Sequence, residues 1–397
     1  MDYRLTDEQL ALKREFNEFF AMEMKEAPTG CGGLVEPITP DAHRFHREMM
    51  KKIAKKGWNI MAWPKEYGGR GAPIIEQLLF NESQAYHLAP GIDPFGVHMF
   101  GPTLMLYASE EQKKRLLPPI ARGEVVYCQG WSEPNAGSDL ASLTTMAVKK
   151  GDYYVINGQK TWITGAHNAD CMFLLARTDP KSKRNKGLSV FYIGDLKAKG
   201  IEIRPIEYMN REHTYNEVFF TDLKVSVEDR IGPENDGWKV SRDTMNFERS
   251  NAGIYITVLR MLVELLKHVK TTRRGGKYLS EHPGVRSRLA RLYMDVEVGR
   301  ALAYRIAWLQ EGGNLRLSPA AASESKVFGT ELLLRGSQLI LEVMGLYGQL
   351  ESSKWTPLDG FMTTRYQYYK SKTISAGSNE IQRNIIAWAG LELPRLR

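Results

Sequence analysis

Three short stretches of the chain combine small, hydroxyl and amide residues in a way that suits a flat, phosphorylated ligand. Residues 132–139 can present backbone N–H groups and hydroxyls to a heteroaromatic edge or to a phosphate. Residues 157–164 include Trp162 and Thr164, which are two residues apart on an expected strand and therefore face the same side. There the indole can stack on a ring system of the ligand and the hydroxyl can bond to it. Residues 375–383 form a loop of small residues before an expected helix, whose first N–H groups are free for a ligand. A plain capped turn would explain the first stretch alone, but the three together indicate a binding site.

Other kinds of catalytic site lack their sequence signatures. His43 and His46 stand at a helical spacing, but HExxH is absent, so a surface pair of histidines is favoured over a metal site. Cys31, Cys128 and Cys171 show no CxxC spacing, which argues against a zinc site and a disulfide framework. The sequence has no Gly-x-Ser-x-Gly elbow, no GxGxxG after a strand and no GxxxxGK[ST], so neither acyl transfer nor a phosphate loop is indicated.

Composition narrows the class of protein further. The chain has 397 residues, 43% hydrophobic and 25% charged, the balance of a globular protein of two or three domains. Because no apolar stretch approaches the roughly 18 residues of a membrane helix and no secretory signal is visible, we expect a cytoplasmic protein without a membrane partner. The net charge of +8 is spread along the chain, so no nucleic-acid partner is expected. The basic run at 181–186 is either a solvated turn or an electropositive lip for a polyphosphorylated ligand.

The elements that position these stretches change twice along the chain. Thr6 with Gln9, and Ser109 with Gln112, form capping boxes that predict helices in the first part. After Gly237 an apolar period of three and four residues returns and predicts long helices to the end of the chain.

Between these helical parts, from about residue 125, the pattern is that of a β domain. Gly-Asp at 151–152 and Asn-Gly at 157–158 are turn signals between runs rich in Val, Ile, Tyr and Trp. Residues 171–176 and 187–193 predict buried strands. The order of helices, β domain and helices argues against an alternating βα sheet. We place the three domains at residues 1–122, 123–236 and 237–397.

Together with residues 63–69 (Trp-Pro-Lys-Glu-Tyr-Gly-Gly), the three stretches resemble four motifs of the acyl-CoA dehydrogenase family, in the same order and spacing. The likeness runs nearly end to end. It implies an α+β multidomain fold with an N-terminal all-α domain, a middle β-barrel-like domain and a C-terminal four-helix bundle. It also implies FAD between the β and C-terminal domains, an acyl-CoA substrate, an electron-transfer flavoprotein as acceptor and a homotetramer, or a heterotetramer with a paralogue.

The resemblance also implies roles for individual residues. Ser132 is expected to bind the pyrimidine edge of the flavin, Trp162 to cover the ring, and Thr164 to lie near N5. Ser138 is expected to reach the FAD phosphates or the pantetheine of the thioester. Trp131, Leu346 and residues 272–276 depart from the family pattern. The full set implied for the cofactor is Gln129, Trp131, Ser132, Ser138, Trp162, Thr164, Arg273, Glu342, Gly345, Ser378 and Glu380.

The catalytic base is expected away from the C-terminal loop. Many family members carry a glutamate where this chain has Ala376, and a methyl group cannot take a proton. Other members supply the base from an earlier helix, and there residues 244–250 place Glu248 at the matching position. The resemblance therefore implies that Glu248 removes the α-proton of the thioester while flavin N5 takes a hydride from the β-carbon, giving a trans-2-enoyl-CoA. The simpler interpretation is a surface glutamate paired with Arg249.

The acyl group itself is left open. Because Ser375 and Ala376 are small, we expect a wide pocket for a bulky, branched, cyclic or steroid-like acyl group. Two other functions stay possible on this fold: a flavin oxidase or monooxygenase, and a silent subunit of a heteromeric enzyme. Asp93 and His98 either read a polar substrate end or are solvated loop residues. The residues implied for the substrate are Asp93, His98, Ser138, Asn246, Arg249, Ala376 and Gly377.

Overall fold

The computed structural model describes residues 4–31, 39–245, 252–312 and 318–395, which form two compact units. The first unit, built from residues 1–26, 73–89 and 250–397, is mainly helical. The second unit, built from residues 27–72 and 90–249, contains the sheet. Both units therefore take segments from the first part of the chain, and the domain boundaries placed near residues 122 and 236 stay a prediction. The predicted succession of helices, strands and helices is confirmed.

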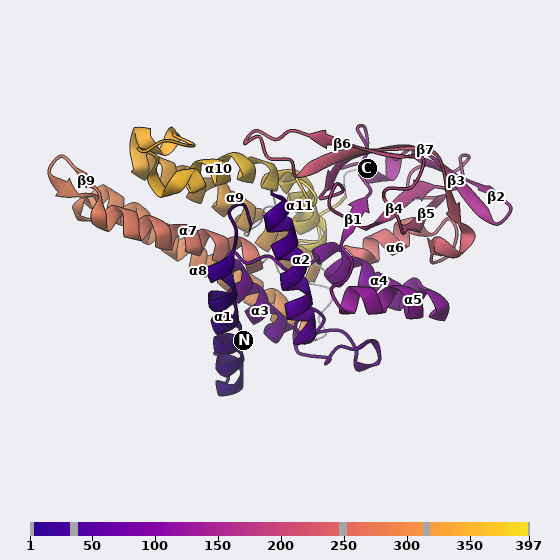
Figure 1. Cartoon of the computed structure of the whole chain (residues 1–397), viewed down its shortest axis with the longest axis horizontal. Helices are drawn as coiled ribbons and strands as arrows, with labels where there is room; N and C mark the ends of the chain where they lie inside the picture. The colour runs from indigo at the N-terminus through magenta and orange to yellow at the C-terminus, as the bar shows by residue number, and fades with distance from the viewer. Residues whose placement is uncertain (1–3, 32–38, 246–251, 313–317, 396–397) are drawn as a thin grey trace. The chain divides into compact units, whose positions relative to one another are not determined.

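The sheet of the second unit has the strand order β6-β7-β3-β2-β4-β5-β8, with β1 beside β4 (Figure 1). Its pairs are antiparallel except that β4 runs parallel to β1 and to the first residue of β2. The strands are β1 (Tyr127–Gly130), β2 (Met146–Lys150), β3 (Tyr153–Thr164), β4 (Cys171–Arg177), β5 (Leu188–Ile193), β6 (Ile201–Ile206), β7 (Tyr215–Ser226) and β8 (Arg230–Ile231).

One of the two predicted turns in this sheet is wrong. Gly151 has a φ of 65° and closes a tight hairpin between β2 and β3, as expected. Asn157 and Gly158 instead lie inside β3, where the Asn157 side chain donates to the Asp222 carboxylate of β7 and accepts from the Asp222 N–H. Gly158 then sits at a register shift where an added Cβ would come within 2.8 Å of Thr145. The Asn-Gly pair therefore marks a bulge rather than a turn.

Alternating side chains of β4 supply two cores, as the period of two in a strand requires. Cys171, Phe173 and Leu175 join a cluster that contains Trp63, Phe100 and Leu117 from outside the sheet. Met172, Leu174 and Ala176 join a second cluster formed mainly by other strands. Every residue of β4 is buried, so the predicted buried strand at 171–176 is confirmed. The helices of this unit are α2 (Pro40–Lys55), α4 (Gly101–Tyr107), α5 (Glu110–Ala121) and α6 (Gly237–Thr244).

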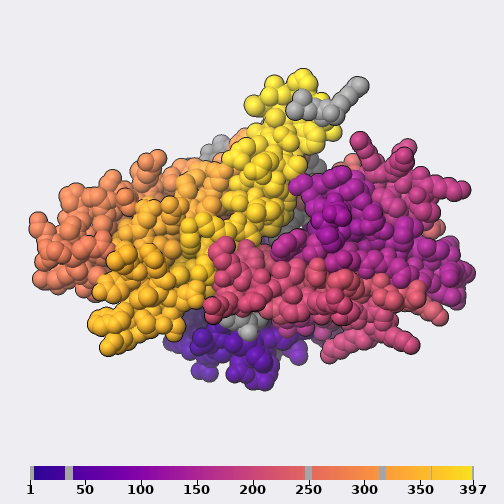
Figure 2. Space-filling view, turned by 90° about the horizontal axis from the view of Figure 1, so that it is seen from above, coloured from indigo at the N-terminus to yellow at the C-terminus, as the bar shows by residue number. Residues whose placement is uncertain are grey.

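The first unit packs long helices against one another. Helices α7, α8 and α9 contact each other in pairs, and α10 and α11 contact α9; Figure 2 shows the yellow C-terminal residues lying directly against the orange ones. The predicted capping box is present, since Gln9 N–H donates to Thr6 Oγ1 at 3.2 Å and Gln9 accepts from the Thr6 N–H at 3.0 Å. The helices are α1 (Asp7–Glu23), α3 (Ile74–Tyr86), α7 (Ala252–Thr271), α8 (Pro283–Glu311), α9 (Ser318–Met344), α10 (Phe361–Tyr369) and α11 (Asn379–Ile385).

None of the helices in the described ranges combines the length and the apolar character that a membrane crossing needs.

Candidate active site

Trp162 presents its indole on a distorted part of β3. Its φ of 59° is rare for a residue with a side chain, and the pairing of β3 with β7 shifts between Lys160 and Ile163. The residue is 58% exposed and meets Tyr215 only edge to face, at 6.0 Å between ring centroids. Asn216, fully buried, holds the distortion by donating to the Ile163 carbonyl at 2.9 Å. A strained backbone that keeps an indole exposed is typical of a ligand-covering position.

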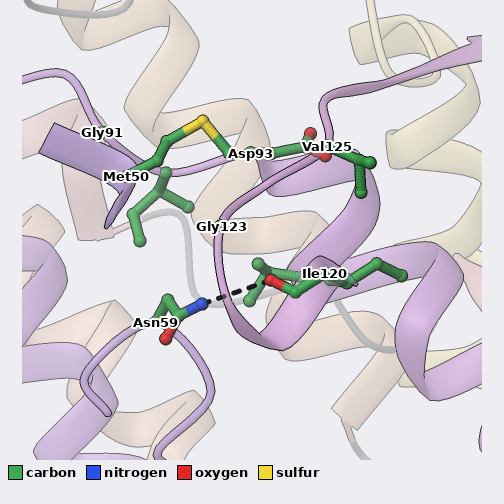
Figure 3. A pocket seen from close by; sticks show the side chains of 9 residues that line it. Met50, Asn59, Gly91, Asp93, Ile120, Gly123 and Val125 are labelled. Atoms are coloured by element: carbon green, nitrogen blue, oxygen red, sulfur yellow. Dashed lines mark hydrogen bonds between the residues drawn. The ribbon is translucent and has the colours of Figure 1, made fainter. Parts of the chain in front are cut away.

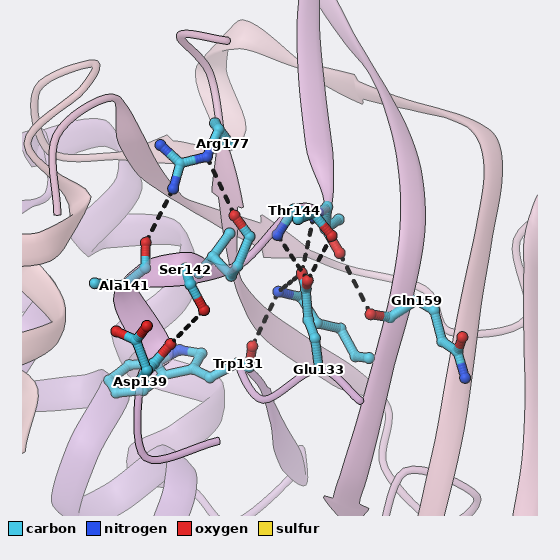
Figure 4. Close-up of polar contacts among 11 residues, drawn as sticks. Trp131, Glu133, Asp139, Ala141, Ser142, Thr144, Gln159 and Arg177 are labelled. Carbon is cyan, nitrogen blue, oxygen red and sulfur yellow. Dashed lines mark hydrogen bonds and ion pairs between the residues drawn. The ribbon is translucent and has the colours of Figure 1, made fainter. Parts of the chain in front are cut away.

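The stretch at 132–139 is tied to β3 by the main chain. The Thr161 N–H donates to the Ser132 carbonyl at 2.9 Å, so the first two predicted stretches lie side by side. The Ser132 N–H has no acceptor among the described residues. Beneath it, Lys160 and Glu133 form a buried ion pair at 2.9 Å (Figure 4). Ser138 is exposed further along the same stretch.

Gln129 and Trp131 flank the point where β1 ends. Gln129 is half-buried on β1, opposite Phe173 of β4. Trp131 is only 5% exposed and packs its indole edge-on against Phe173 at 5.6 Å. Its indole N–H is buried without a hydrogen-bond partner in the described part of the chain. A buried donor of this kind costs free energy unless another group accepts from it.

Arg177 organises the chain beyond Ser138. Its guanidinium, 8% exposed, donates to the carbonyls of Ala141 at 3.0 Å and Leu143 at 3.1 Å (Figure 4). It also donates to three carbonyls of the basic run between β4 and β5, those of Ser182, Arg184 and Lys186. The side chains of this run are exposed, and one arginine therefore fixes both segments.

The third stretch, in the other unit, is a loop held by its carbonyl groups. Ala376 and Gly377 have φ values of 54° and 78°. Gln382 donates to both of their carbonyls, at 3.2 and 3.4 Å, and Gln382 in turn accepts from Ser323 at 2.7 Å. The N–H groups of Ala376 and Gly377 have no acceptor among the described residues. The loop therefore offers two free donors on a fixed backbone.

A buried lysine supports the same loop from below. Lys326 of α9 is 7% exposed and donates to Asn379 Oδ1 at 2.9 Å and to the Thr373 carbonyl at 3.4 Å. Burial lowers its pKa to about 8. The predicted ligand Ser378 caps α11 through the Ile381 N–H. Glu380 is exposed, and hydrogen bonds from its own N–H and from Ser378 lower its pKa.

The predicted cofactor residues Arg273, Glu342 and Gly345 lie apart from this loop, within the same unit. Arg273 is exposed on the small hairpin of β9 (Arg273–Arg274) and β10 (Lys277–Tyr278). Its guanidinium stacks over the ring of its cross-strand partner Tyr278 at 4.3 Å. Glu342 accepts from Arg288 at 2.9 Å. Gly345, with a φ of 70°, ends α9.

Asp93 and His98 are not solvated loop residues. Asp93 is 3% exposed, and its carboxylate accepts from the Phe95 N–H at 3.0 Å and the Tyr127 N–H at 2.9 Å. His98 lies in the helical turn Phe95–Phe100, and burial lowers its pKa to about 4, so it is neutral at physiological pH. Asp93 thus holds two backbone segments together through its hydrogen bonds. A role in substrate binding stays a prediction for both Asp93 and His98.

Two small pockets adjoin Asp93. One has a volume of about 30 Å³ and is lined by Thr164, Asn168, His43 and His46, among others. The two histidines are half-buried, so the expectation of a surface pair is wrong. His46 is held inward because its Nδ1 accepts from the Gly91 N–H. The other pocket is mainly apolar, and its Asn59 donates to the Ile120 carbonyl at 3.4 Å (Figure 3). Asn59 also donates to the Ala121 carbonyl at 2.9 Å. Within the described ranges, no group of three or more His, Cys, Asp or Glu residues is arranged for a metal ion.

The predicted base Glu248, with Asn246 and Arg249, lies outside the described residues. The preceding helix α6 ends at Thr244, whose hydroxyl bonds Thr103 of α4 at 2.7 Å. Sequence reasoning missed the structural roles of Lys160, Arg177 and Lys326. The sequence offers one signal for such roles, a charged residue next to an apolar run. Arg177, for example, stands directly after the apolar run 171–176.

Comparison with known proteins identifies the class to which this fold belongs. The chain matches the family models for the acyl-CoA dehydrogenase N-terminal domain at residues 6–124, middle domain at residues 128–223 and C-terminal domain at residues 235–391. The chain therefore belongs to the acyl-CoA dehydrogenase family, and it is an FAD-dependent oxidoreductase that acts on acyl-CoA. The predicted family, fold, enzyme class and cofactor are confirmed.

Individual relatives narrow the comparison. Acyl-CoA dehydrogenase FadE26 of Mycobacterium tuberculosis is 35% identical over 98% of both chains. The ChsE4-ChsE5 complex of Mycobacterium tuberculosis contains a chain 34% identical to this one, with a TM-score of 0.87 over 100% of both chains. The Tcur3481-Tcur3483 steroid ACAD is 32% identical, with a TM-score of 0.88, and is likewise covered completely.

The described residues fit FAD within each unit. An exposed indole at Trp162 suits the covering of a flat ring, and the unused Ser132 N–H suits a ring edge that accepts hydrogen bonds. In the helical unit, Ser378 begins α11, and the free N–H groups of Ala376 and Gly377 stand directly before it. Such donors at a helix start suit negatively polarised oxygen atoms.

Proposed function

We propose that this chain oxidises the α,β bond of a bulky, steroid-like acyl-CoA and yields the trans-2-enoyl thioester. The observation that carries the proposal is the loop at Ala376, which has no carboxylate and whose two N–H groups find no acceptor in the described part of the chain. Bound FAD would supply the acceptor for the hydride that leaves the β carbon. The remaining tasks fall to residues of the chain, namely to hold the thioester carbonyl, to remove a proton and to keep the ring in place.

Holding the carbonyl is the task we assign to the Ala376 N–H. An α-proton of a thioester is too weakly acidic for an ordinary carboxylate, so negative charge that develops on the carbonyl oxygen must be stabilised. A backbone donor on a loop fixed by Gln382 needs no reorganisation when that charge appears. The methyl side chain of Ala376 leaves this donor unchanged.

Removing the proton is the task we assign to Glu248. No carboxylate stands at Ala376, and Glu248 is the acid that the family pattern places in the alternative position. A general base contributes about 10²–10⁴-fold to rate when its pKa is tuned by its surroundings. Trp162 is proposed to cover the flavin ring, and Thr164 to lie beside it.

The proposed acyl group is bulky for two reasons. Ser375 and Ala376 are small, which leaves space beside the loop. The similar Tcur3481-Tcur3483 protein is described as a steroid ACAD. We also propose that an electron-transfer flavoprotein takes the electrons. Both similar structures pair two different chains, which favours a heterotetramer with a paralogue over a homotetramer.

Glu248→Gln tests the assignment of the base. The purified variant should keep FAD and its yellow colour but lose turnover at least about 100-fold, because an amide cannot accept the proton. Glu110→Gln is the matched control, since it neutralises an exposed carboxylate of α5 that pairs with Lys113. Retained turnover in Glu248→Gln would move the base to another residue. If the native chain binds no FAD when it is produced alone, the site needs a partner chain.

A panel of CoA thioesters tests the acyl group. Steroid-like, branched and straight saturated thioesters are mixed with the oxidised holoenzyme without oxygen, and bleaching of the flavin absorption is followed. Faster bleaching by the steroid-like thioester is expected. A preference for a straight saturated chain would refute the wide pocket without affecting the assignment of Glu248.

A further inference from the structure

A lysine and a glutamate are buried together directly under the start of the 132–139 stretch. Lys160 has no exposed surface, and its ammonium donates to Glu133 Oε1 at 2.9 Å and to the Trp131 carbonyl at 3.0 Å (Figure 4). Glu133 also accepts from the Thr144 N–H at 2.6 Å and the Thr145 N–H at 2.8 Å. Every contact belongs to the sheet-containing unit.

Both members of the pair are charged at neutral pH. Burial lowers the pKa of Lys160 to about 8, and its neighbour Glu133 opposes this effect. Burial alone would raise the pKa of Glu133, but the charge of Lys160 and the hydrogen bonds from Thr144 and Thr145 hold that pKa at about 2. Buried ion pairs add little net stability compared with apolar side chains of the same size. Stability alone therefore does not explain why a charge is kept here.

The position of the ammonium suggests another explanation. The carbonyl that it binds belongs to the peptide group between Trp131 and Ser132, and the N–H of the same peptide group is that of Ser132. A charged donor on a peptide oxygen polarises the group and makes its N–H a stronger donor. This N–H has no acceptor among the described residues.

We propose that Lys160 is a positioning residue that strengthens the Ser132 N–H as a donor to the pyrimidine edge of FAD, and that Glu133 fixes the ammonium in place. The inference rests on the proposed function only in placing that edge at Ser132. Reduction adds electron density to the pyrimidine part of a flavin, so a stronger donor there favours reduced over oxidised FAD and raises the reduction potential.

Lys160→Met tests the proposal in the full-length holoenzyme. The dissociation constants of oxidised and reduced FAD are measured for each protein, together with the midpoint potential of bound FAD. The variant should favour reduced FAD about tenfold less than the native protein does, which equals a midpoint potential lower by about 30 mV. These quantities are read without thioester turnover, so they do not depend on Glu248 or on the acyl group.

Phe191→Leu is the matched control, because this side chain is fully buried in the same unit and bonds no residue of the stretch. It should loosen packing without moving the potential. An unchanged potential in Lys160→Met, or an equal shift in the Phe191→Leu control, would overturn the proposal.

Glu133→Gln covers the case in which Lys160→Met does not fold. This variant keeps the lysine and its bond to Trp131 but removes the negative charge beside it. Removal of the Glu133 charge lowers the pKa of Lys160 further, so the comparison is made at a pH low enough to keep the ammonium, where the midpoint potential of the variant should lie above that of the native protein. A lower potential would overturn the proposal as well.

Discussion

Lys326 gives the stability of this protein a specific dependence on pH. Its pKa is about 8 in the folded chain against an ordinary value of 10.5, and burial is the main cause of this difference. At neutral pH the buried ammonium therefore costs roughly 3 kcal/mol. Lys326→Met removes this cost but leaves the Thr373 carbonyl without its donor, which costs about 1–3 kcal/mol. Near pH 7 the variant and the native protein should thus be about equally stable.

Above pH 8 the two proteins should separate. The folded native protein releases the Lys326 proton near pH 8, whereas the unfolded chain keeps it to about pH 10.5. The unfolded state then binds one more proton, so the free energy of unfolding of the native protein rises by about 1.4 kcal/mol per pH unit in this window. By about pH 9.5 the native protein should have gained about 2 kcal/mol over Lys326→Met.

Urea unfolding of both holoproteins at several pH values between about 7 and 9.5 measures this difference. Lys160, which also has a pKa of about 8, is present in both proteins, and its contribution cancels. Lys149→Met, at an exposed position of β2, is the control and should follow the native protein at every pH. A difference between Lys326→Met and the native protein that stays constant with pH would show that Lys326 is not desolvated.

Three further predictions follow from single contacts. Gly377→Ala forces a side chain into a φ of 78°, so it should cost about 1–3 kcal/mol of loop stability and lower kcat/KM at least about tenfold, as steady-state kinetics will show. Arg177→Met leaves five main-chain carbonyls without their hydrogen-bond donor and should lower the free energy of unfolding by more than about 3 kcal/mol. Proteolysis at residues 181–186 should also become faster. Glu82→Leu leaves the partly exposed Lys13 and Arg300 without their shared carboxylate and should lower the free energy of unfolding by about 1–3 kcal/mol, as urea unfolding will show. An unchanged free energy of unfolding would contradict the importance of these two contacts.

Local patterns made much of the fold predictable. The Thr6–Gln9 and Ser109–Gln112 capping boxes and the apolar run at 171–176 depend on neighbours in sequence, and the structure reproduces them. The turn predicted at Asn157-Gly158 is wrong because the partner of Asn157, Asp222, lies 65 residues away, and the pair forms a bulge inside β3.

The candidate site shows the same limit more clearly. The motif residues were predictable from their resemblance to a family, but the buried partners that hold them were not. In the sequence, Lys160 resembles any polar residue of a strand. Its contacts with Glu133 and the Trp131 carbonyl become apparent only in the folded structure. The left-handed backbone of Trp162 likewise follows from pairing with β7, which no local pattern encodes.

The five bonds of Arg177 have a consequence for anyone who wishes to redesign the surface of this protein. Its guanidinium joins Ala141 and Leu143 to the basic run after β4, so a graft or deletion there would also disturb the backbone just after Ser138. A chimaera that exchanges this run with that of a relative would have to carry the arginine and the matching chain lengths on both sides. The segment at residues 141–143 and the basic run at residues 181–186 would therefore have to be exchanged together.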